Sequence, residues 1–320
     1  MKIFFHNDLD GVACASLYLA DSIKDMNYVL VPISTHMRGE AFETLTNKEK
    51  EPFVIFDFQY AHNAKLWVDH HQNDFMGNEA IKTPDIIYNP RAPSAAGLMT
   101  TIDKPGVKAL VSAVDMIDSA GYPNPAYIFN DKSPYMILRA FIEFSYPSEM
   151  MFARIAEILA LCDYDIEKAL HIMNIDVSYV DAMRYRAIKI KDRIEIYGNT
   201  ITIVRQKSSY QFPRFSENFL KPEARYNIRI SEHDKLNFNV RIAFNKWSNL
   251  QNNINIGAYL GGSSLTVSGG GHFTVGGAIV GKTKLDEFLN EFSSIVEGEK
   301  EWKSTVSISK MTTSRNRLKN

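Results

Sequence analysis

The sequence contains little cysteine and has no long hydrophobic run. Only two of its 320 residues are cysteine, Cys14 and Cys162, and they form no CxxC motif. Because both lie in helical patterns, we expect buried, reduced thiols, as in a cytoplasmic protein. No apolar stretch approaches the roughly 18 residues that span a membrane, and the N-terminus lacks the basic flank and long apolar core of a signal peptide. The sequence therefore predicts a cytoplasmic protein with no membrane partner.

Net charge is also small, but the two signs are unevenly distributed along the chain. The formal net charge is −1, yet residues 1–131 carry ten Lys and Arg against 17 Asp and Glu. The remainder of the chain is correspondingly basic. This asymmetry fits a carboxylate-rich metal centre beside a surface that attracts anions, and it fits chance surface charge equally well. Hydrophobic residues make up 45% of the chain, which is ordinary for a soluble globular protein of up to two domains.

The first 130 residues alternate between strand and helix patterns. Helical patterns, including residues 12–20 and 94–102, lie between short apolar runs. Alternation of this kind predicts a mostly parallel sheet covered by helices. The runs that predict strands are residues 2–5, 28–33, 53–56, 66–68 and 86–88.

Two further parts follow this alternating segment. Residues 131–194 have helical spacing throughout and predict a helical connector, including a helix at 179–194. Strand patterns then appear, and two of them, at 226–230 and 236–244, predict a hairpin. We therefore place an N-terminal domain at 1–130, the connector at 131–194, a C-terminal domain at 195–302 and a basic tail at 303–320.

Four apolar runs of the first domain end in residues that can bind a metal ion. A single carboxylate at the end of a strand usually caps the next helix, but four such places in one domain are harder to dismiss. Parallel strands bring their carboxyl ends to one edge of the sheet, where so much negative charge requires multivalent cations. The residues are His6, Asp8 and Asp10 in the segment HNDLDG; Asp57 after 53–56; Asp69, His70 and His71 after 66–68; and Asp115 after 111–114, with Asp118 one turn later.

A glycine-rich block is the second strong signal. Gly269, Gly270 and Gly271 precede His272, and the block lies between a helical pattern at 255–260 and an apolar strand at 278–280. Consecutive glycines let backbone N–H groups approach an anion closely, although such a run is more often a flexible loop.

Together, these motifs resemble those of the DHH phosphoesterase family, whose name matches Asp69-His70-His71. The order and approximate spacing of the four acidic motifs agree, and residues 269–272 resemble the GGGH motif of the DHHA1 domain. That domain accompanies DHH in the RecJ-like and nano-RNase-like branch, which usually has Ala-Ala-Gly where this chain has residues 276–278, Gly-Gly-Ala. The resemblance implies an α/β fold of two lobes. These are a mostly parallel sheet with helices on both faces, and a smaller α/β domain with a mixed sheet beyond the helical connector.

The resemblance also implies a ligand set for two metal ions. One ion is expected on His6, Asp8 and Asp57, with Asp57 bridging to the other. Mn²⁺ is the expected cofactor, and the mixed imidazole and carboxylate donors leave Mg²⁺ and Co²⁺ open. Asp69 is expected to orient a histidine. The second ion is expected on Asp10, Asp57, His70 and Asp115, with Asp118 as the alternative to Asp115.

The function implied is a phosphodiesterase that cleaves short RNA or DNA oligonucleotides, or small phosphorylated nucleotides, with a metal-activated water. Asp57 and His71 are the expected catalytic residues, His71 contacting a phosphoryl oxygen or protonating the leaving group. Arg241 and residues 269–272 would bind substrate. A pyrophosphatase or exopolyphosphatase and a non-catalytic nucleic-acid-binding module are the alternatives. The glycine block argues against the first, and the intact ligand set argues against the second. A homodimer is left open.

Overall fold

The computed structural model describes residues 1–22, 27–71, 85–99, 103–145, 147–198, 200–206, 212–271 and 273–298. The chain divides into two compact units. Unit 1 contains Met1–Pro123 and Tyr127–Met183, and unit 2 contains Asn124–Ala126 and the described residues from Arg184 onward. His272 and the predicted basic tail lie outside the described residues. The predicted domain boundaries at residues 130, 194 and 302 stay predictions.

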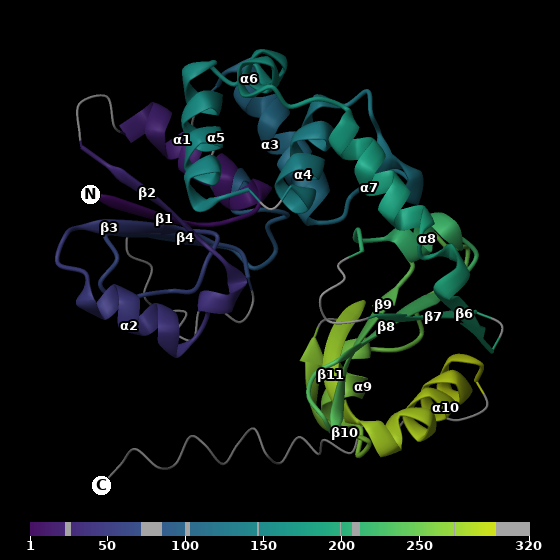
Figure 1. Ribbon diagram of the computed structural model, residues 1–320. Coiled ribbons are helices and arrows are strands. Elements are labelled where there is room, and N and C mark those ends of the chain that lie inside the picture. Colours follow the sequence, from purple (N-terminus) through teal and green to yellow (C-terminus); the bar gives the residue numbers. More distant parts are fainter. Residues whose placement is uncertain are drawn as a thin grey trace, which may run out of the picture. The chain divides into compact units, whose positions relative to one another are not determined.

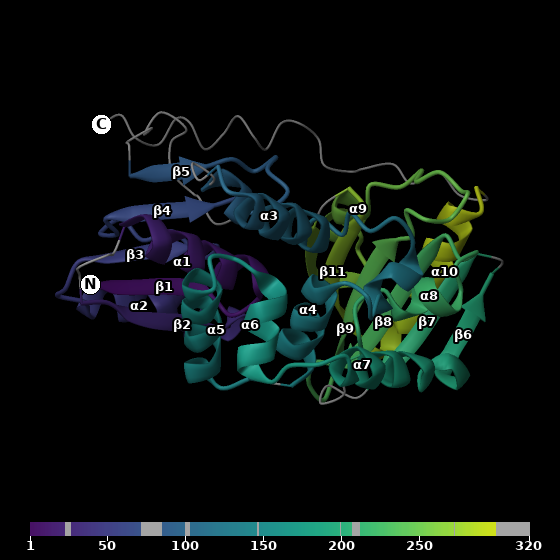
Figure 2. The ribbon, with the colours of Figure 1, turned by 90° about the horizontal axis from the view of Figure 1, so that it is seen from above.

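A five-stranded parallel sheet forms the centre of unit 1. Its order is β2-β1-β3-β4-β5, and every neighbouring pair is parallel (Figure 2). The central strands are buried on both faces, which explains why they are short continuous apolar runs rather than alternating ones. All five predicted strands are confirmed. They are β1 (Lys2–His6), β2 (Val29–Ile33), β3 (Phe53–Phe56), β4 (Leu66–Asp69) and β5 (Ile86–Tyr88).

Helices cover both faces of this sheet. On one face lie α1 (Leu9–Ser22) and α5 (Glu149–Leu161), and on the other lies α2 (Glu40–Lys48) (Figure 1). Phe42 of α2 packs edge-on against Phe4 of β1 and Phe58. The remaining described elements of unit 1 include α3 (Pro105–Asp118), α4 (Pro134–Phe144), α6 (Ile166–Met173) and the 3₁₀ turns η1 (Thr35–Met37) and η2 (Ala96–Leu98).

The structure corrects two predicted helices and shows that one of the four apolar runs that precede ligand-type residues is not a strand. The apolar run 111–114 is not a strand but the interior of α3, because Pro105 opens a helix and residues 107, 110, 111 and 114 place one apolar face on the core. The predicted helix at 94–102 forms only the short turn η2 within its described part. The predicted helix at 179–194 ends early, as α7 (Ser178–Ile188), followed by the 3₁₀ turn η4 (Lys191–Arg193).

Unit 2 contains a mixed six-stranded sheet in the order β10-β11-β9-β8-β7-β6. Only β7 and β8 pair in parallel, and the predicted hairpin is confirmed as the antiparallel pair β8–β9. The strands are β6 (Ile194–Tyr197), β7 (Ile201–Gln206), β8 (Tyr226–Glu232), β9 (Asn237–Phe244), β10 (Thr266–Gly271) and β11 (Val275–Gly281). The short helix α8 (Ser216–Leu220) lies between β7 and β8.

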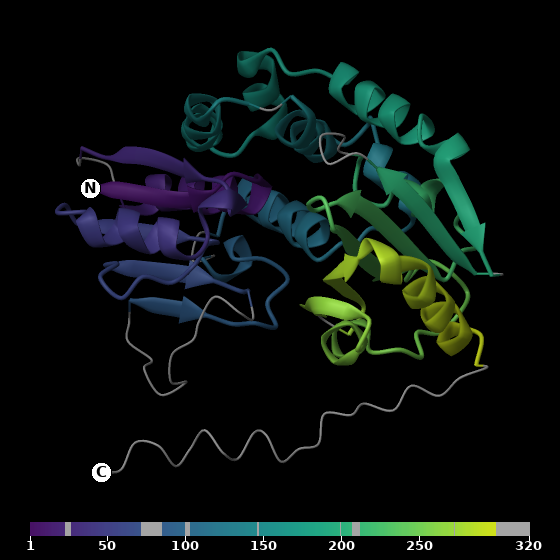
Figure 3. The same cartoon turned by 60° about the horizontal axis from the view of Figure 1, so that its bottom comes forward.

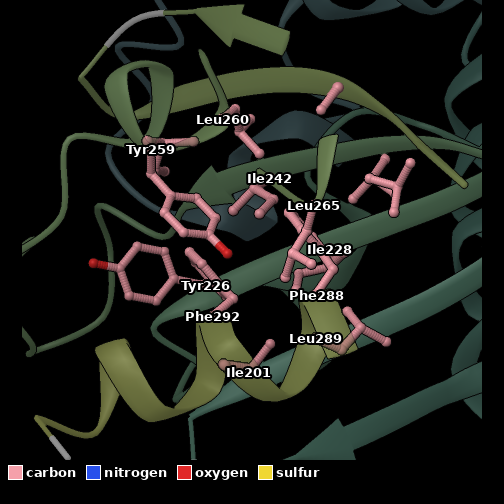
Figure 4. Close-up of a cluster of buried hydrophobic side chains, with 14 of the residues drawn as sticks. Ile201, Tyr226, Ile228, Ile242, Tyr259, Leu260, Leu265, Phe288, Leu289 and Phe292 are labelled. Atoms are coloured by element: carbon pink, nitrogen blue, oxygen red, sulfur yellow. The ribbon is translucent and has the colours of Figure 1, made fainter. Parts of the chain in front are cut away.

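Two helices close the core of unit 2 on one face of its sheet. These are α9 (Ile256–Gly262) and α10 (Leu285–Val296) (Figure 3). Tyr259 of α9 packs against Phe288 and Phe292 of α10, and Tyr226 of β8 packs against Phe292 (Figure 4). Burial of these large side chains is the main stabilising contribution of this layer.

The glycine block is part of the sheet and not a loop. Residues 266–271 form β10, which pairs with β11. A Cβ at Gly257 would lie 2.1 Å from the carbonyl oxygen of Gly271, so α9 approaches β10 more closely than a side chain allows. Gly271 has a φ of 145°, which also favours glycine. The local reason for glycine is therefore the packing of α9 on β10 at Gly257, and the positive φ and the contact with β11 at Gly271.

The sequence predicts reduced thiols and no membrane-spanning segment. Both cysteines are buried and unpaired. Among the described residues, no helix is both long enough and apolar enough to span a membrane.

Replacing Gly257 with alanine is expected to destabilise unit 2 by more than about 2 kcal/mol, because the new methyl group meets backbone that cannot turn aside. Urea unfolding followed by tryptophan fluorescence and circular dichroism measures this. The matched control is Gly281→Ala, since nothing lies within 4 Å of a Cβ at Gly281, and its stability should stay within about 0.5 kcal/mol of wild type. Equal stability of the two variants would contradict the packing argument.

Candidate metal centre

The predicted ligand residues of unit 1, except Asp115, meet at the carboxyl edge of its parallel sheet. His6 ends β1, Asp57 follows β3, and His70 and His71 follow β4. Since β3 pairs with both β1 and β4, the three strand ends are neighbours. Ligands of open α/β sheets bind at this edge.

The segment HNDLDG places three ligand-type groups by capping a helix. Asp8 is the N-cap of α1, and its Oδ1 accepts a hydrogen bond from the N–H of Gly11 at 3.0 Å. The other carboxylate oxygen of Asp8 lies 2.6 Å from Nδ1 of His6. A Cβ at Gly11 would lie 2.2 Å from the carbonyl oxygen of His6, so glycine lets the helix start directly against the strand. Asp10, in the first turn of α1, then points into the sheet edge and is 2% exposed.

Asp57 lies between the other groups. It is 1% exposed and has a φ of 55°, a left-handed conformation that is uncommon for residues other than glycine and often marks a functional position. Its Oδ2 is 3.3 Å from Nδ1 of His6, and its Oδ1 is 3.7 Å from Nε2 of His70. Oδ1 accepts no hydrogen bond. The two oxygens of one carboxylate thus face two different groups, as a bridging ligand requires.

The histidines of the DHH triplet are held in defined orientations. Nδ1 of His70 donates a hydrogen bond to the carbonyl oxygen of Ala92 at 3.0 Å. In the neutral ring the lone pair is therefore on Nε2, the atom that faces the carboxylates. Asp69 is fully buried, and its Oδ1 lies 2.9 Å from Nδ1 of His71. Asp69 therefore orients His71, in the histidine-orienting role that the sequence predicts.

The structure separates the two acidic residues of α3. Oδ2 of Asp118 lies 3.1 Å from Nε2 of His70, and Asp118 groups with His70 and Asp10. Asp115, three residues earlier, instead accepts a hydrogen bond from the hydroxyl of Ser94 at 2.5 Å through its Oδ1. The structure thus brings Asp118 to the ligand groups and does not bring Asp115 there.

Ligand atoms from these residues form overlapping groups within 4.8 Å of one another. One group is His6, Asp8 and Asp57, and a second is Asp10, His70 and Asp118. A third, Asp57, His70 and His71, overlaps the second at His70 and the first at Asp57. The structure therefore contains three overlapping groups that could hold a metal ion, and Asp57 belongs to two of them.

The electrostatics of the site show uncompensated negative charge. Burial raises the pKa of Asp10 to about 7, and repulsion from Asp118 and Asp8 adds to the effect. Burial, followed by repulsion from Asp10, raises the pKa of Asp57 well above its usual range. Burial lowers the pKa of His70, but the Asp118 carboxylate outweighs it and the pKa rises to about 9. Multivalent cations would relieve this repulsion.

The residues fit bound divalent cations. Two buried atoms that could coordinate a metal, Oδ1 of Asp57 and Nε2 of His70, meet no hydrogen-bond criterion and lie 3.7 Å apart. The donors are imidazole nitrogen and carboxylate oxygen, a mixture that suits Mn²⁺ and related divalent ions.

Two of the predicted substrate residues of unit 2, Arg241 and Gly269, line the same pocket. Arg241 of β9, Gly269 of β10 and Gly277 of β11 line one pocket on the sheet, together with Asn239 and Ser268. Arg241 is exposed and opposite Gly277 in the strand register. The predicted Gly270 and Gly271 continue β10 but do not line this pocket, and His272 lies outside the described residues.

Arg38 is a candidate that the sequence analysis missed. Its guanidinium lies 4.9 Å above the ring of Phe58, whose ring centroid is 5.9 Å from that of His6. Burial lowers the pKa of His71, but the Asp69 carboxylate outweighs it and the pKa is raised; the positive charge of Arg38 opposes this rise. A lone arginine after a strand carries no distinctive pattern. Its position after β2, at the same sheet edge as His6, was the only signal.

Solved structures show which known fold this chain shares. A pGpG-specific phosphodiesterase, PggH from Vibrio cholerae, matches with a TM-score of 0.64 and 19% sequence identity over 93% of this chain and 99% of that chain. The chain therefore has the α/β fold of PggH, and the predicted fold class, with a parallel first sheet and a mixed second sheet, is confirmed.

Other structural neighbours have lower scores. RecJ from Thermus thermophilus in complex with Mn²⁺ matches with a TM-score of 0.44 and 12% identity over 94% of this chain and 52% of that chain. The DHH domain of a member of the s1p family of ribosomal proteins matches with a TM-score of 0.48 and 14% identity over 91% of this chain and 86% of that chain. No protein-family model and no curated protein matches the sequence.

Mn²⁺ is expected to raise the melting temperature of the wild-type chain and not that of Asp57→Asn. Binding at 100 times the dissociation constant adds about 2.7 kcal/mol to the free energy of unfolding. Without metal, Asp57→Asn should melt at the same temperature or higher. The folded pKa of Asp57 is raised above its unfolded value, so ionisation at neutral pH destabilises the fold. Differential scanning calorimetry measures both effects.

The matched control for this experiment is Asp103→Asn. Asp103 is an exposed carboxylate paired with Lys108, and its replacement should keep the full Mn²⁺ shift. An Asp57→Asn variant that retains the shift would contradict the assignment of Asp57 as a shared ligand.

Proposed function

We propose that the chain is a metal-dependent phosphodiesterase that hydrolyses short oligonucleotides or related small phosphorylated nucleotides. The observation that carries the proposal is the pair of ligand groups joined at Asp57, His6-Asp8-Asp57 and Asp10-His70-Asp118. The shared fold with a pGpG-specific phosphodiesterase supports the same class of reaction. Mn²⁺ is the proposed cofactor, with Mg²⁺ and Co²⁺ as alternatives. From the last of the four acidic motifs, Asp118 is the proposed ligand in place of Asp115.

The residues of unit 1 have separate roles in this proposal. When bound, two divalent cations would supply an activated water and offset charge on the phosphoryl oxygens. Asp57 holds the two ligand groups together from the end of β3. The Asp69 carboxylate holds Nδ1 of His71, so Nε2 is the ring nitrogen that remains to donate a hydrogen bond. The raised pKa of His71 favours its charged form, which suits contact with a phosphoryl oxygen. Arg38 would add a second positive group at the same edge.

The pocket on β9, β10 and β11 is the proposed binding site for the part of the substrate away from the cleaved bond. Gly270 and Gly277 are paired across β10 and β11. Nothing lies within 4 Å of a Cβ at Gly270, and a Cβ at Gly277 would make only ordinary contacts at 3.8 Å and 3.9 Å. Packing therefore does not require glycine at these two positions, whereas close approach of a ligand to the sheet would. Arg241 beside them supplies a cation for a phosphate.

A substrate panel tests the proposed reaction. With Mn²⁺, linear dinucleotides and RNA or DNA of up to about ten nucleotides should be cleaved to mononucleotides, resolved by liquid chromatography. Asp57→Asn, checked for folding by circular dichroism, should lose at least about 10³-fold in kcat. If none of these substrates is cleaved, the proposal is rejected. If phosphate is released only from pyrophosphate or polyphosphate, the alternative enzyme class is supported.

Two substitutions should separate the proposed roles of the two units. Arg38→Met should lower kcat by about 100-fold, because it removes a charge that faces the reacting phosphoryl group. Gly277→Leu should raise KM about 10-fold or more with kcat nearly unchanged, because the new side chain fills the pocket beside Arg241. Arg205→Met and Gly281→Leu are the matched controls. The reverse pattern of kcat and KM effects would contradict the division of roles.

A further inference from the structure

Asp115 has a partner network that the proposed reaction does not use. On α3 it lies three residues before Asp118, and its Oδ1 accepts the hydrogen bond from the hydroxyl of Ser94. Ser94 is fully buried, and its Oγ accepts a second hydrogen bond, from the N–H of Gly97 at 3.0 Å. One serine hydroxyl thus connects α3 to the turn at residues 94–97.

The same turn holds Asp10 through two backbone groups. The N–H of Ala95 donates to Oδ2 of Asp10 at 2.7 Å, and the N–H of Ala96 donates to Oδ1 at 2.8 Å. Each carboxylate oxygen therefore has one backbone donor; Oδ1 also accepts from the thiol of Cys14, and Oδ2 lies 3.6 Å from Nε2 of His70. The turn decides which way the remaining lone pairs of Asp10 point.

The turn is tightly packed against Asp115. A Cβ at Gly97 would lie 2.9 Å from Oδ1 of Asp115 and 3.4 Å from Oγ of Ser94. Because Gly97 has no side chain, the carboxylate of Asp115 fits against the turn. Asp115, Ser94 and Gly97 are therefore held in one fixed arrangement.

We propose that Asp115 is a positioning residue for the second cation position and not a ligand of it. Through Ser94 it fixes the turn at residues 94–97, and the turn fixes the carboxylate of Asp10 beside His70 and Asp118. Partners one step removed from a metal ligand typically contribute 10–100-fold to metal affinity. This inference rests on the proposed function, because it requires that Asp10, His70 and Asp118 bind a cation.

Mn²⁺ titration by isothermal calorimetry distinguishes a positioning role from ligation. Asp115→Asn keeps an acceptor oxygen for Ser94 and should retain two bound Mn²⁺ with near wild-type affinity. Asp115→Ala removes the acceptor and should weaken the second Mn²⁺ by about 10-fold while keeping two ions. Ser94→Ala should weaken it to a similar extent. The double variant should lose little more than either single variant, because both act on one connection.

Asp118→Asn serves as the ligand comparison and should lose the second Mn²⁺ outright. If Asp115→Asn loses it as well, Asp115 is a ligand and the inference is overturned. Wild-type affinity in Asp115→Ala overturns it too. If Asp118→Asn and Asp57→Asn both bind two Mn²⁺ normally, the proposed metal site itself fails, which is a separate result.

Amide hydrogen exchange in the metal-free chain tests the connection without any metal. The amides of Ala95 and Ala96 should exchange about 10-fold faster in Asp115→Ala than in wild type, with Asp115→Asn restoring most of the protection. Unchanged protection in Asp115→Ala would overturn the inference whatever the Mn²⁺ affinities are.

Discussion

Repulsion among buried carboxylates is the constraint on which the rest of this structure depends. Asp10 and Asp57 are almost fully buried at the carboxyl edge of the parallel sheet, and their pKa values are raised because burial and neighbouring acids oppose ionisation. Bringing these carboxylates together in a buried site lowers the stability of the fold. Divalent cations would turn the repulsion into attraction, so the placement of these carboxylates and the proposed chemistry have one electrostatic explanation.

The surrounding structure holds this unfavourable arrangement in place with ordinary interactions. Asp8 caps α1, Asp69 holds His71, the carbonyl of Ala92 fixes the tautomer of His70, and two backbone N–H groups hold Asp10. Each of these contacts orients a donor before any cation binds, which lowers the cost of organising the site. The left-handed backbone of Asp57 is part of the same arrangement, since it lets one carboxylate face two groups.

Glycine has two different roles in unit 2, and only the structure separates them. At Gly257 a side chain would collide with the backbone of β10, and at Gly271 with the backbone of β11, so close backbone packing accounts for these residues. At Gly270 and Gly277 there is room for a side chain, and the exposed sheet beside Arg241 is the proposed reason for glycine there. A run of glycines in the sequence suggests an anion loop, but this run is a strand.

The sequence by itself determined the parallel sheet and most of the ligand groups. In the segment HNDLDG, after 53–56 and in Asp69-His70-His71, the strand and the ligand are adjacent in the chain, so spacing along the chain predicts position in space. Only the tertiary structure separates Asp115 from Asp118, because it places Asp118 beside His70 and Asp115 beside Ser94. The run before them is a helix, and two carboxylates three residues apart on a helix reach different partners according to how that helix packs. It also decided the place of Arg38, since its contact with Phe58 joins segments that no local pattern connects.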